Sequence, residues 1–213
     1  MGSSSTQAAE RYPDPLDAGN LEALVSGRHG APFDVLGSHV VTVGKRRLWV
    51  VRVLRPYADA IAVIPEEPDG TAAEQRRWPE ALAMSLLHDA GLFSLVTPLD
   101  DAEQPPRYRL DIHFVSGDSL ETADPYALLP FLSEYDLYLL GEGNDLKLYE
   151  KLGAHPCTHQ GVDGVAFAVW APAARRVSIV GNFNGWDERV SPMRMRPNGV
   201  WELFWPGLRA GEY

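Results

Sequence analysis

The clearest chemical signal in this sequence is a tryptophan that follows an asparagine–glycine pair, in the run FNGWD at residues 183–187. An indole offers a flat apolar face to the C–H face of a glucose ring, and neighbouring amide and carboxylate groups can hydrogen-bond the ring hydroxyls. The Asn-Gly pair predicts a type I′ hairpin turn, because both central residues of that turn have positive φ. Trp186, Asn184 and Asp187 are therefore the candidate sugar-binding residues.

The same run also allows a purely structural interpretation, in which Trp186 packs against the strands of its own hairpin and Asn184 only makes the turn. The other tryptophans fit a protein interior better. Trp201, Leu203 and Trp205 alternate along one face of a predicted strand, which is how the core of a β-sandwich is filled. The tryptophans that we assign to the core are Trp49, Trp170, Trp201 and Trp205.

No motif in the chain assigns a catalytic residue, a metal site or a cofactor. Retaining glycoside chemistry needs two carboxylates about 5–5.5 Å apart, and no motif fixes such a pair among the 29 acidic residues. The sequence also lacks a phosphate-binding P-loop, a dinucleotide fingerprint and a nucleophile elbow. His155, Cys157 and His159 alternate in the run HPCTH, but a zinc site needs a fourth ligand that the sequence does not supply. We therefore expect no catalytic residue, no metal and no cofactor.

The composition argues against several other classes of protein. A net charge of −10 disfavours a nucleic-acid partner and an anionic membrane surface, because both need clustered Lys and Arg. No apolar run approaches the length of about 18 residues that spans a bilayer, and the N-terminus shows no secretory signal. The single cysteine, Cys157, cannot form an internal disulfide, which fits a reducing compartment. We expect a cytoplasmic protein that binds neither nucleic acid nor membrane.

The positions of apolar residues predict mostly β structure. Period-two alternation predicts strands over 48–54, 60–65, 91–97 and 108–115, and again over 165–172, 175–183 and 200–206. Residues 78–88 fit a short helix or an irregular sheet edge. Residues 1–20 contain almost no large apolar side chains, which predicts a disordered tail, and a short helix follows at 21–26.

A segment of different character separates the two β regions. Pro125 and Pro130 interrupt the chain, and the leucines that follow lie near helical spacing. Asp136 and Asp145 are the expected N-caps of these helical turns, and Gly153 is the expected C-terminal stop. The segment therefore predicts a helical connector between two domains.

An internal repeat relates the two β regions. When the sequence is shifted by 116 residues, LGSH at 36–39 falls on LGAH at 152–155, and Pro56 falls on Pro172. The apolar positions around that proline match as well, at 51, 53, 61 and 63 against 167, 169, 177 and 179. A shared proline between matching strands predicts the same strand–turn–strand geometry twice.

The repeat also predicts that the second copy is incomplete. In the first copy, Gly91 is followed 17 residues later by Tyr108, where the fourth strand opens. In the second copy, Gly199 lies 14 residues before the last residue, Tyr213. We therefore expect the second sandwich to lack its closing strand.

The segment FAVWAPAARRVSIVGNFNGWD at 167–187 resembles the glycogen-binding β-sandwich known as carbohydrate-binding module family forty-eight. The shared features are the WAP turn, the strand VSIVG and the FNGWD run. The segment LYLLGEGNDLKLYEKLGAH at 137–155 is similar to the connector before this module in bacterial 1,4-α-glucan (glycogen) branching enzymes, and DPYALLP at 124–130 is similar to their first module. Debranching enzymes and trehalose-forming hydrolases share the WAP and FNGW features but are not expected to carry this connector.

The repeat and the resemblance together imply an all-β protein. We expect two tandem immunoglobulin-like β-sandwiches joined by a short helical connector, with the second sandwich truncated at its C-terminus. The expected parts are a disordered tail (1–20), a first β-sandwich module (21–123), the connector (124–153) and an incomplete β-sandwich of the glycogen-binding type (154–213).

The resemblance further implies that this segment binds or positions glucan for an enzyme that cleaves α-1,4-glucan chains and transfers them into α-1,6 branches. The expected partners are α-glucan (glycogen) and a (β/α)₈ catalytic domain in the same parent chain, so the 213 residues alone should be inactive. Two alternatives stay open. One is a stand-alone glycogen-binding module without catalysis, and the other is the N-terminal part of a debranching or trehalose-forming hydrolase.

Overall fold

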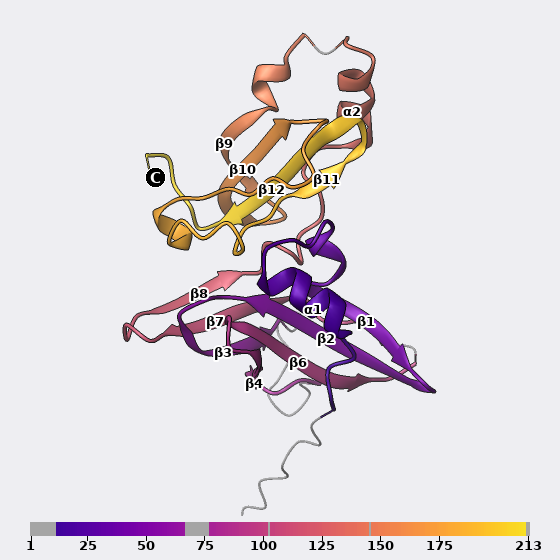
Figure 1. Cartoon of the computed structure of the whole chain (residues 1–213), viewed down its shortest axis with the longest axis vertical. Helices are drawn as coiled ribbons and strands as arrows, with labels where there is room; N and C mark the ends of the chain where they lie inside the picture. The colour runs from indigo at the N-terminus through magenta and orange to yellow at the C-terminus, as the bar shows by residue number, and fades with distance from the viewer. Residues whose placement is uncertain (1–11, 67–76, 102, 145, 212–213) are drawn as a thin grey trace, which may run out of the picture.

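The computed structural model describes residues 12–66, 77–101, 103–144 and 146–211, which form two β units that follow each other along the chain (Figure 1). The strands form three four-stranded sheets, all antiparallel. The predicted all-β fold with a short helical connector is confirmed. Residues 1–11 of the expected tail and Asp145, an expected N-cap, lie outside the described residues.

The first unit is a sandwich of two sheets, with strand orders β1-β2-β6-β5 and β4-β3-β7-β8. Its strands are β1 (Gly37–Val43), β2 (Arg46–Leu54), β3 (Ala58–Pro65), β4 (Leu82–Ala83), β5 (Ser85–His88), β6 (Leu92–Leu99), β7 (Tyr108–Phe114) and β8 (Ser119–Ala123). Side chains of β2, β3, β6 and β7 fill the space between the sheets around the fully buried Trp49. The ambiguous segment 78–88 supplies the edge strands β4 and β5 and no helix.

The second unit has one sheet, with the order β11-β12-β10-β9. Its strands are β9 (Gly153–His159), β10 (Val162–Trp170), β11 (Arg194–Arg196) and β12 (Val200–Pro206). Trp201, Leu203 and Trp205 of β12 pack on the irregular segment 171–193, through Val177, Ile179, Phe183 and Val190. The predicted core role of Trp201 and Trp205 is therefore correct.

Two predictions for the second unit are wrong. Residues 175–183 form no regular strand, and only the bridge between Ser178 and Pro192 remains. The reason is the missing partner: β3, the corresponding strand of the first unit, pairs along its length with β7, and the described part of the second unit contains no such strand. Trp170 is 58% exposed rather than in the core, because it ends β10 and turns its Nε1 to donate to Asn198 O (2.9 Å).

The internal repeat is confirmed at the level of hydrogen-bonded register. Gly37 of β1 pairs with Arg52 of β2, and the positions 116 residues later, Gly153 and Ala168, pair in the same way between β9 and β10. The histidine of each LGxH run donates from Nε2 to the carbonyl of the leucine three residues before it, at 2.9 Å in both copies. These histidines therefore have the same structural role twice.

The two predicted helical segments also belong to the repeat, which the sequence comparison had matched only from LGSH at 36–39 onward. Helix α1 (Ala18–Val25) and the 3-10 turn η1 (Pro32–Asp34) recur 116 residues later as α2 (Glu134–Gly141) and η3 (Leu148–Glu150). Asp17 caps α1, and Ser133, at the matching position, caps α2. The predicted N-cap Asp136 is instead the third residue of α2, where it completes a capping box with Ser133. The connector is thus also the first part of the second copy.

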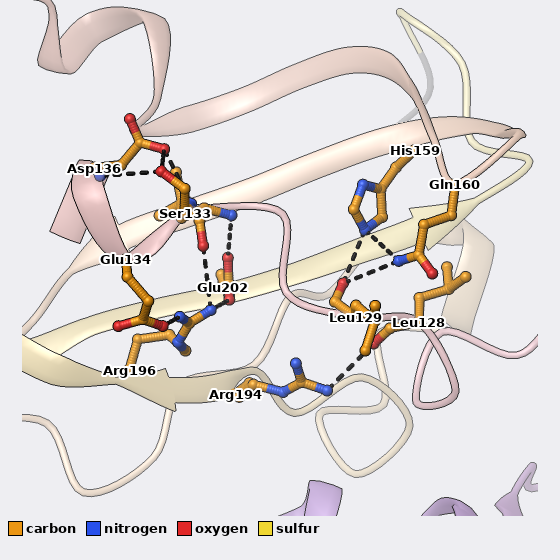
Figure 2. A network of polar contacts seen from close by, with 11 residues as sticks. Leu128, Leu129, Ser133, Glu134, Asp136, His159, Gln160, Arg194, Arg196 and Glu202 are labelled. Carbon is orange, nitrogen blue, oxygen red and sulfur yellow. Dashed lines mark hydrogen bonds and ion pairs between the residues drawn. The ribbon is translucent and has the colours of Figure 1, made fainter.

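In both copies the helical segment covers the outer face of the sheet that follows it. In the second unit, Leu132 and Leu137 pack on Ala168 and Val200. Polar contacts fix this cover: Glu202 of β12 accepts from Leu132 N (3.0 Å). Glu202 also pairs with Arg196, as Figure 2 shows. Arg196 also reaches Glu134 of α2 at 2.5 Å.

In the first unit the equivalent ion pair joins the segment before α1 to strand β2. The guanidinium of Arg52 on β2 binds the carboxylate of Asp14 in a two-pronged ion pair (Nη2–Oδ1 2.7 Å, Nε–Oδ2 2.9 Å), and Ser94 of β6 donates to the same carboxylate. Both charged side chains are almost fully buried. Burial alone would raise the pKa of Asp14, but the bonds from Arg52 and Ser94 lower it. Residues 12–20 are therefore fixed to the sandwich, in contrast to the predicted disordered tail.

The two units are also joined directly. Tyr126, which follows β8, packs on Leu36 and Leu54 of the first unit, and its hydroxyl donates to Val190 O (3.0 Å) of the second. Arg189 of the second unit donates to Val25 O (3.3 Å) at the end of α1.

Asp14→Ala is expected to lower the free energy of unfolding at pH 7 by about 3–5 kcal/mol, because it leaves Arg52 buried without its counter-charge. The folded-state pKa of Asp14 is lowered, so its stabilising contribution is complete above the ordinary value of 3.8 and is lost as the pH falls through the folded value. Urea denaturation of both proteins at pH 7 and at about pH 2 measures this difference. The control is Asp59→Ala, which removes an exposed carboxylate; equal losses in the two variants at pH 7 would contradict the role of Asp14.

Candidate functional site

The FNGWD run forms a compact loop and not a type I′ hairpin. Residues Asn182–Asn184 make a 3-10 turn (η4), and the positive φ values fall at Gly185 (64°) and Trp186 (59°), one position later than predicted. The prediction was wrong because the side chain of Asn184 takes part in the backbone bonding of the loop, which a turn assignment from the Asn-Gly pair alone does not consider.

Asn184 holds the loop closed. Its Oδ1 accepts from Gly181 N (2.9 Å), and its Nδ2 donates to Ile179 O (2.9 Å) and to Ser191 Oγ. The side chain is only partly exposed, and its oxygen and both of its N–H groups are engaged in these bonds. The arrangement matches the structural interpretation of Asn184, namely that it makes the turn.

Asp187 is engaged in a similar way. Its carboxylate accepts from the backbone N–H of Arg189 (2.9 Å) and forms a two-pronged ion pair with the guanidinium of that residue (Nη2–Oδ2 2.6 Å). These bonds from Arg189 are the main cause of the lowered pKa of Asp187, which burial opposes. Asp187 therefore stays ionised and directs its charge to Arg189.

Trp186 presents its ring to solvent. The side chain is 62% exposed, and Nε1 donates to Asn182 Oδ1 (2.9 Å) from the first residue of η4. One edge of the indole is thereby fixed while its face stays open, at a residue whose positive φ is uncommon for a bulky side chain. Of the three predicted residues, Trp186 alone offers a free binding surface, and Asn182 is the residue beside it that the sequence reasoning missed.

A pocket adjoins this loop between the two units. It has a volume of about 270 Å³ and is lined by the turn between β2 and β3, the region of β8 and the loop itself. Its lining includes Arg55, Tyr57, Phe114, Asn182, Phe183 and Trp205. Sequence reasoning could not find it, because more than a hundred residues separate Tyr57 from Asn182.

The remaining sites considered in the sequence have ordinary structural environments. Among the described residues, no group of three or more His, Cys, Asp or Glu is placed to hold a metal ion. His155 bonds to Leu152 O, and His159 bonds to Leu129 O at 2.8 Å (Figure 2). No helix in the part of the chain that the structure covers is long and apolar enough to cross a membrane.

The fold and the loop define a class of tandem β modules, in which a β-sandwich is followed by a second module that carries an exposed tryptophan. Residues 151–213 match the family described as carbohydrate-binding module 48 (isoamylase N-terminal domain). Residues 17–126 match the family described as alpha-1,4-glucan branching enzyme GlgB, N-terminal domain, and the chain belongs to this family.

Similar proteins carry the name 1,4-alpha-glucan branching enzyme GlgB. They include proteins from Nitrobacter winogradskyi (47% identical over 190 residues, 89% of this chain), Bradyrhizobium sp. strain ORS 278 (46% over 192, 90%) and Rhodopseudomonas palustris strain CGA009 (48% over 192, 90%). The chain spans 24% of the length of each of these relatives. A solved pullulanase from Anoxybacillus sp. LM18-11 aligns with 80% of this chain and 22% of its own, at 12% identity and a TM-score of 0.21, which is too low to compare the folds.

Asn184→Ala is expected to lower the free energy of unfolding by about 1–3 kcal/mol, because Gly181 N and Ile179 O lose their partner inside the loop. Trp186→Ala removes a mostly exposed side chain and is expected to change it by no more than about 0.5 kcal/mol. Thermal and urea denaturation measure both. A loss for Trp186→Ala as large as that for Asn184→Ala would mean that the indole packs on the protein and is not held out for a ligand.

Proposed function

We propose that the chain is the N-terminal, non-catalytic part of a 1,4-α-glucan branching enzyme and that it binds α-glucan through Trp186. The parent enzyme cleaves α-1,4-glucan chains and transfers them to form α-1,6 branches in glycogen. The family membership and the branching-enzyme relatives support this proposal. We also propose that the protein works in the cytoplasm, where glycogen is built.

The observation that carries the binding proposal is the exposed indole of Trp186, held by Asn182 in a unit that matches a carbohydrate-binding module. A flat apolar ring fixed at one edge suits the C–H face of a glucose residue. Asn184 and Asp187 build the loop that presents Trp186, so their contribution to binding is indirect. Weak affinity is sufficient, because tethering to the enzyme keeps the polymer at a high effective concentration.

We propose a catalytic barrel domain of the parent chain as the second partner. Three exposed aromatic side chains, Tyr135, Tyr138 and Trp170, support this proposal, because each is at least 58% exposed. Helix α2 and Trp170 meet at Asn198, which donates to Leu137 O (2.9 Å) and accepts from Trp170 Nε1. Exposed apolar patches commonly mark protein interfaces.

For the domain boundaries, we propose that the second module starts with the cap of α2 at Ser133 instead of at residue 154. The 116-residue spacing of the two helices and of their caps supports this start.

Trp186→Ala is expected to weaken glycogen binding about tenfold, which corresponds to the loss of about 1.4 kcal/mol of apolar contact with a sugar ring. Affinity electrophoresis of the 213-residue chain in gels with increasing glycogen measures the change as reduced retardation. Trp186→Phe is expected to keep part of the retardation. The matched control is Tyr149→Ala, which removes another exposed aromatic side chain, on η3. Unchanged retardation of Trp186→Ala would remove Trp186 from the site.

The enzymatic part of the proposal is tested on the full-length protein with amylose as substrate. We expect new α-1,6 branch points. A debranching enzyme cleaves them, so the short linear chains that it releases measure their number. The 213-residue chain alone is expected to leave amylose unchanged. Release of free glucose or trehalose by the full-length protein would instead identify a hydrolase.

A further inference from the structure

The pocket between the two units has the composition of a sugar site. Its volume of about 270 Å³ is near the lower end of the range of about 300–1,000 Å³ for small-molecule pockets, which suits one or two sugar rings. Aromatic side chains line it from both units: Tyr57 and Phe114 from the first, Phe183 and Trp205 from the second. Asn182 and Thr122 add an amide and a hydroxyl group to the lining, and none of the described residues that line the pocket carries a carboxylate.

Arg55 supplies unpaired hydrogen-bond donors at this place. The residue is only 7% exposed, and its guanidinium lies over the ring of Trp205, with Cζ 5.1 Å from the ring centroid. Within the described part of the chain, the guanidinium makes one hydrogen bond, from Nη1 to Leu54 O (3.1 Å). Among the described residues, each nitrogen of the Arg55 side chain is either accessible to solvent or hydrogen-bonded. Arg55 lines the pocket, and its guanidinium carries further N–H groups besides the one that is bonded to Leu54 O.

Tyr57 has a backbone conformation that its side chain does not favour. It follows Pro56 in a tight turn closed by Ala58 N to Arg55 O (3.3 Å), and its φ is 68°. Turns of this kind with a proline before a residue of positive φ usually place glycine there. At the matching position of the second copy stands Ala173, which has no positive φ. A tyrosine that keeps such a conformation while 72% exposed is a candidate for a functional side chain.

We propose that this pocket binds a glucose residue of an α-glucan chain, with the ring of Tyr57 as an aromatic platform and Arg55 as a donor to the sugar hydroxyls. The proposal rests on the proposed function and extends the binding site from the second unit to the first. Asn182 links the two contacts, because it lines the pocket and also accepts the hydrogen bond of Trp186. One glucan chain then contacts both units, which Tyr126 and Arg189 hold together.

Tyr57→Gly separates binding from stability. Glycine relieves the positive φ, so the variant is expected to melt no lower than the wild type, yet it lacks the aromatic platform. Isothermal titration of the 213-residue chain with maltoheptaose is expected to show about fivefold to tenfold weaker binding for Tyr57→Gly. Tyr57→Trp restores the platform and is expected to bind within about twofold of the wild type. Tyr149→Ala is the control, and its affinity is expected to be unchanged.

The outcomes distinguish the two proposals. Wild-type affinity in Tyr57→Gly together with weakened binding in Trp186→Ala would overturn the pocket and leave the proposed function intact. No binding of maltoheptaose or glycogen by the wild-type chain would overturn both. Weakened binding in Tyr57→Gly and in Trp186→Ala, with a greater loss for maltoheptaose than for maltose, would support a chain that spans the two contacts.

Discussion

In each unit the sheet that contains the repeated hairpin, β1-β2 or β9-β10, has an apolar outer face that must be covered. This constraint organises the protein. In the first unit, Leu24 and Val25 of α1 cover Leu54 and Leu92. In the second unit, Leu132 and Leu137 cover Ala168 and Val200. In each case the cover comes from the chain just before the hairpin, so the helix and the hairpin form one repeating element. The charges that anchor the cover differ, with Asp14–Arg52 in one copy and Glu134–Arg196–Glu202 in the other.

The two copies differ most on the inner side of the sheet, and there the second copy acquires its binding loop. In the first copy a complete second sheet closes the core, with β3 and β7 paired along their length. In the second copy an irregular segment closes it through Phe183 and Val190. Apart from the bridge between Ser178 and Pro192, this segment makes no regular ladder, so side chains such as Asn184 bond its backbone groups. In a strand, the pleat decides to which face a side chain points. An irregular loop has no such restriction and can hold an indole outward.

Local pattern made much of the fold predictable. Alternate side chains of β3 are buried on the core, as its sequence pattern predicts, whereas β12 is buried on both faces. The matching LGxH runs gave the register of the repeat. The failures depend on contacts distant in sequence. Residues 175–183 have strand-like alternation but lack a partner strand in the described part of the chain. Asp14 is held in place by Arg52, which is 38 residues away in the sequence. In the site, the exposed Trp186 could be predicted from its motif. The pocket with Arg55 and Tyr57 could not, because it exists only where the two units meet.

The ion pair of Asp14 with Arg52 shows that the folded unit is longer than its recognisable family segment. Similarity to the GlgB N-terminal domain begins at residue 17, three positions after Asp14. A protein trimmed to that boundary for expression would retain the buried guanidinium and discard its counter-ion. For this fold, therefore, the ends of an expressed protein should include both partners of each buried ion pair on the sheet face, and should not simply follow the extent of sequence similarity.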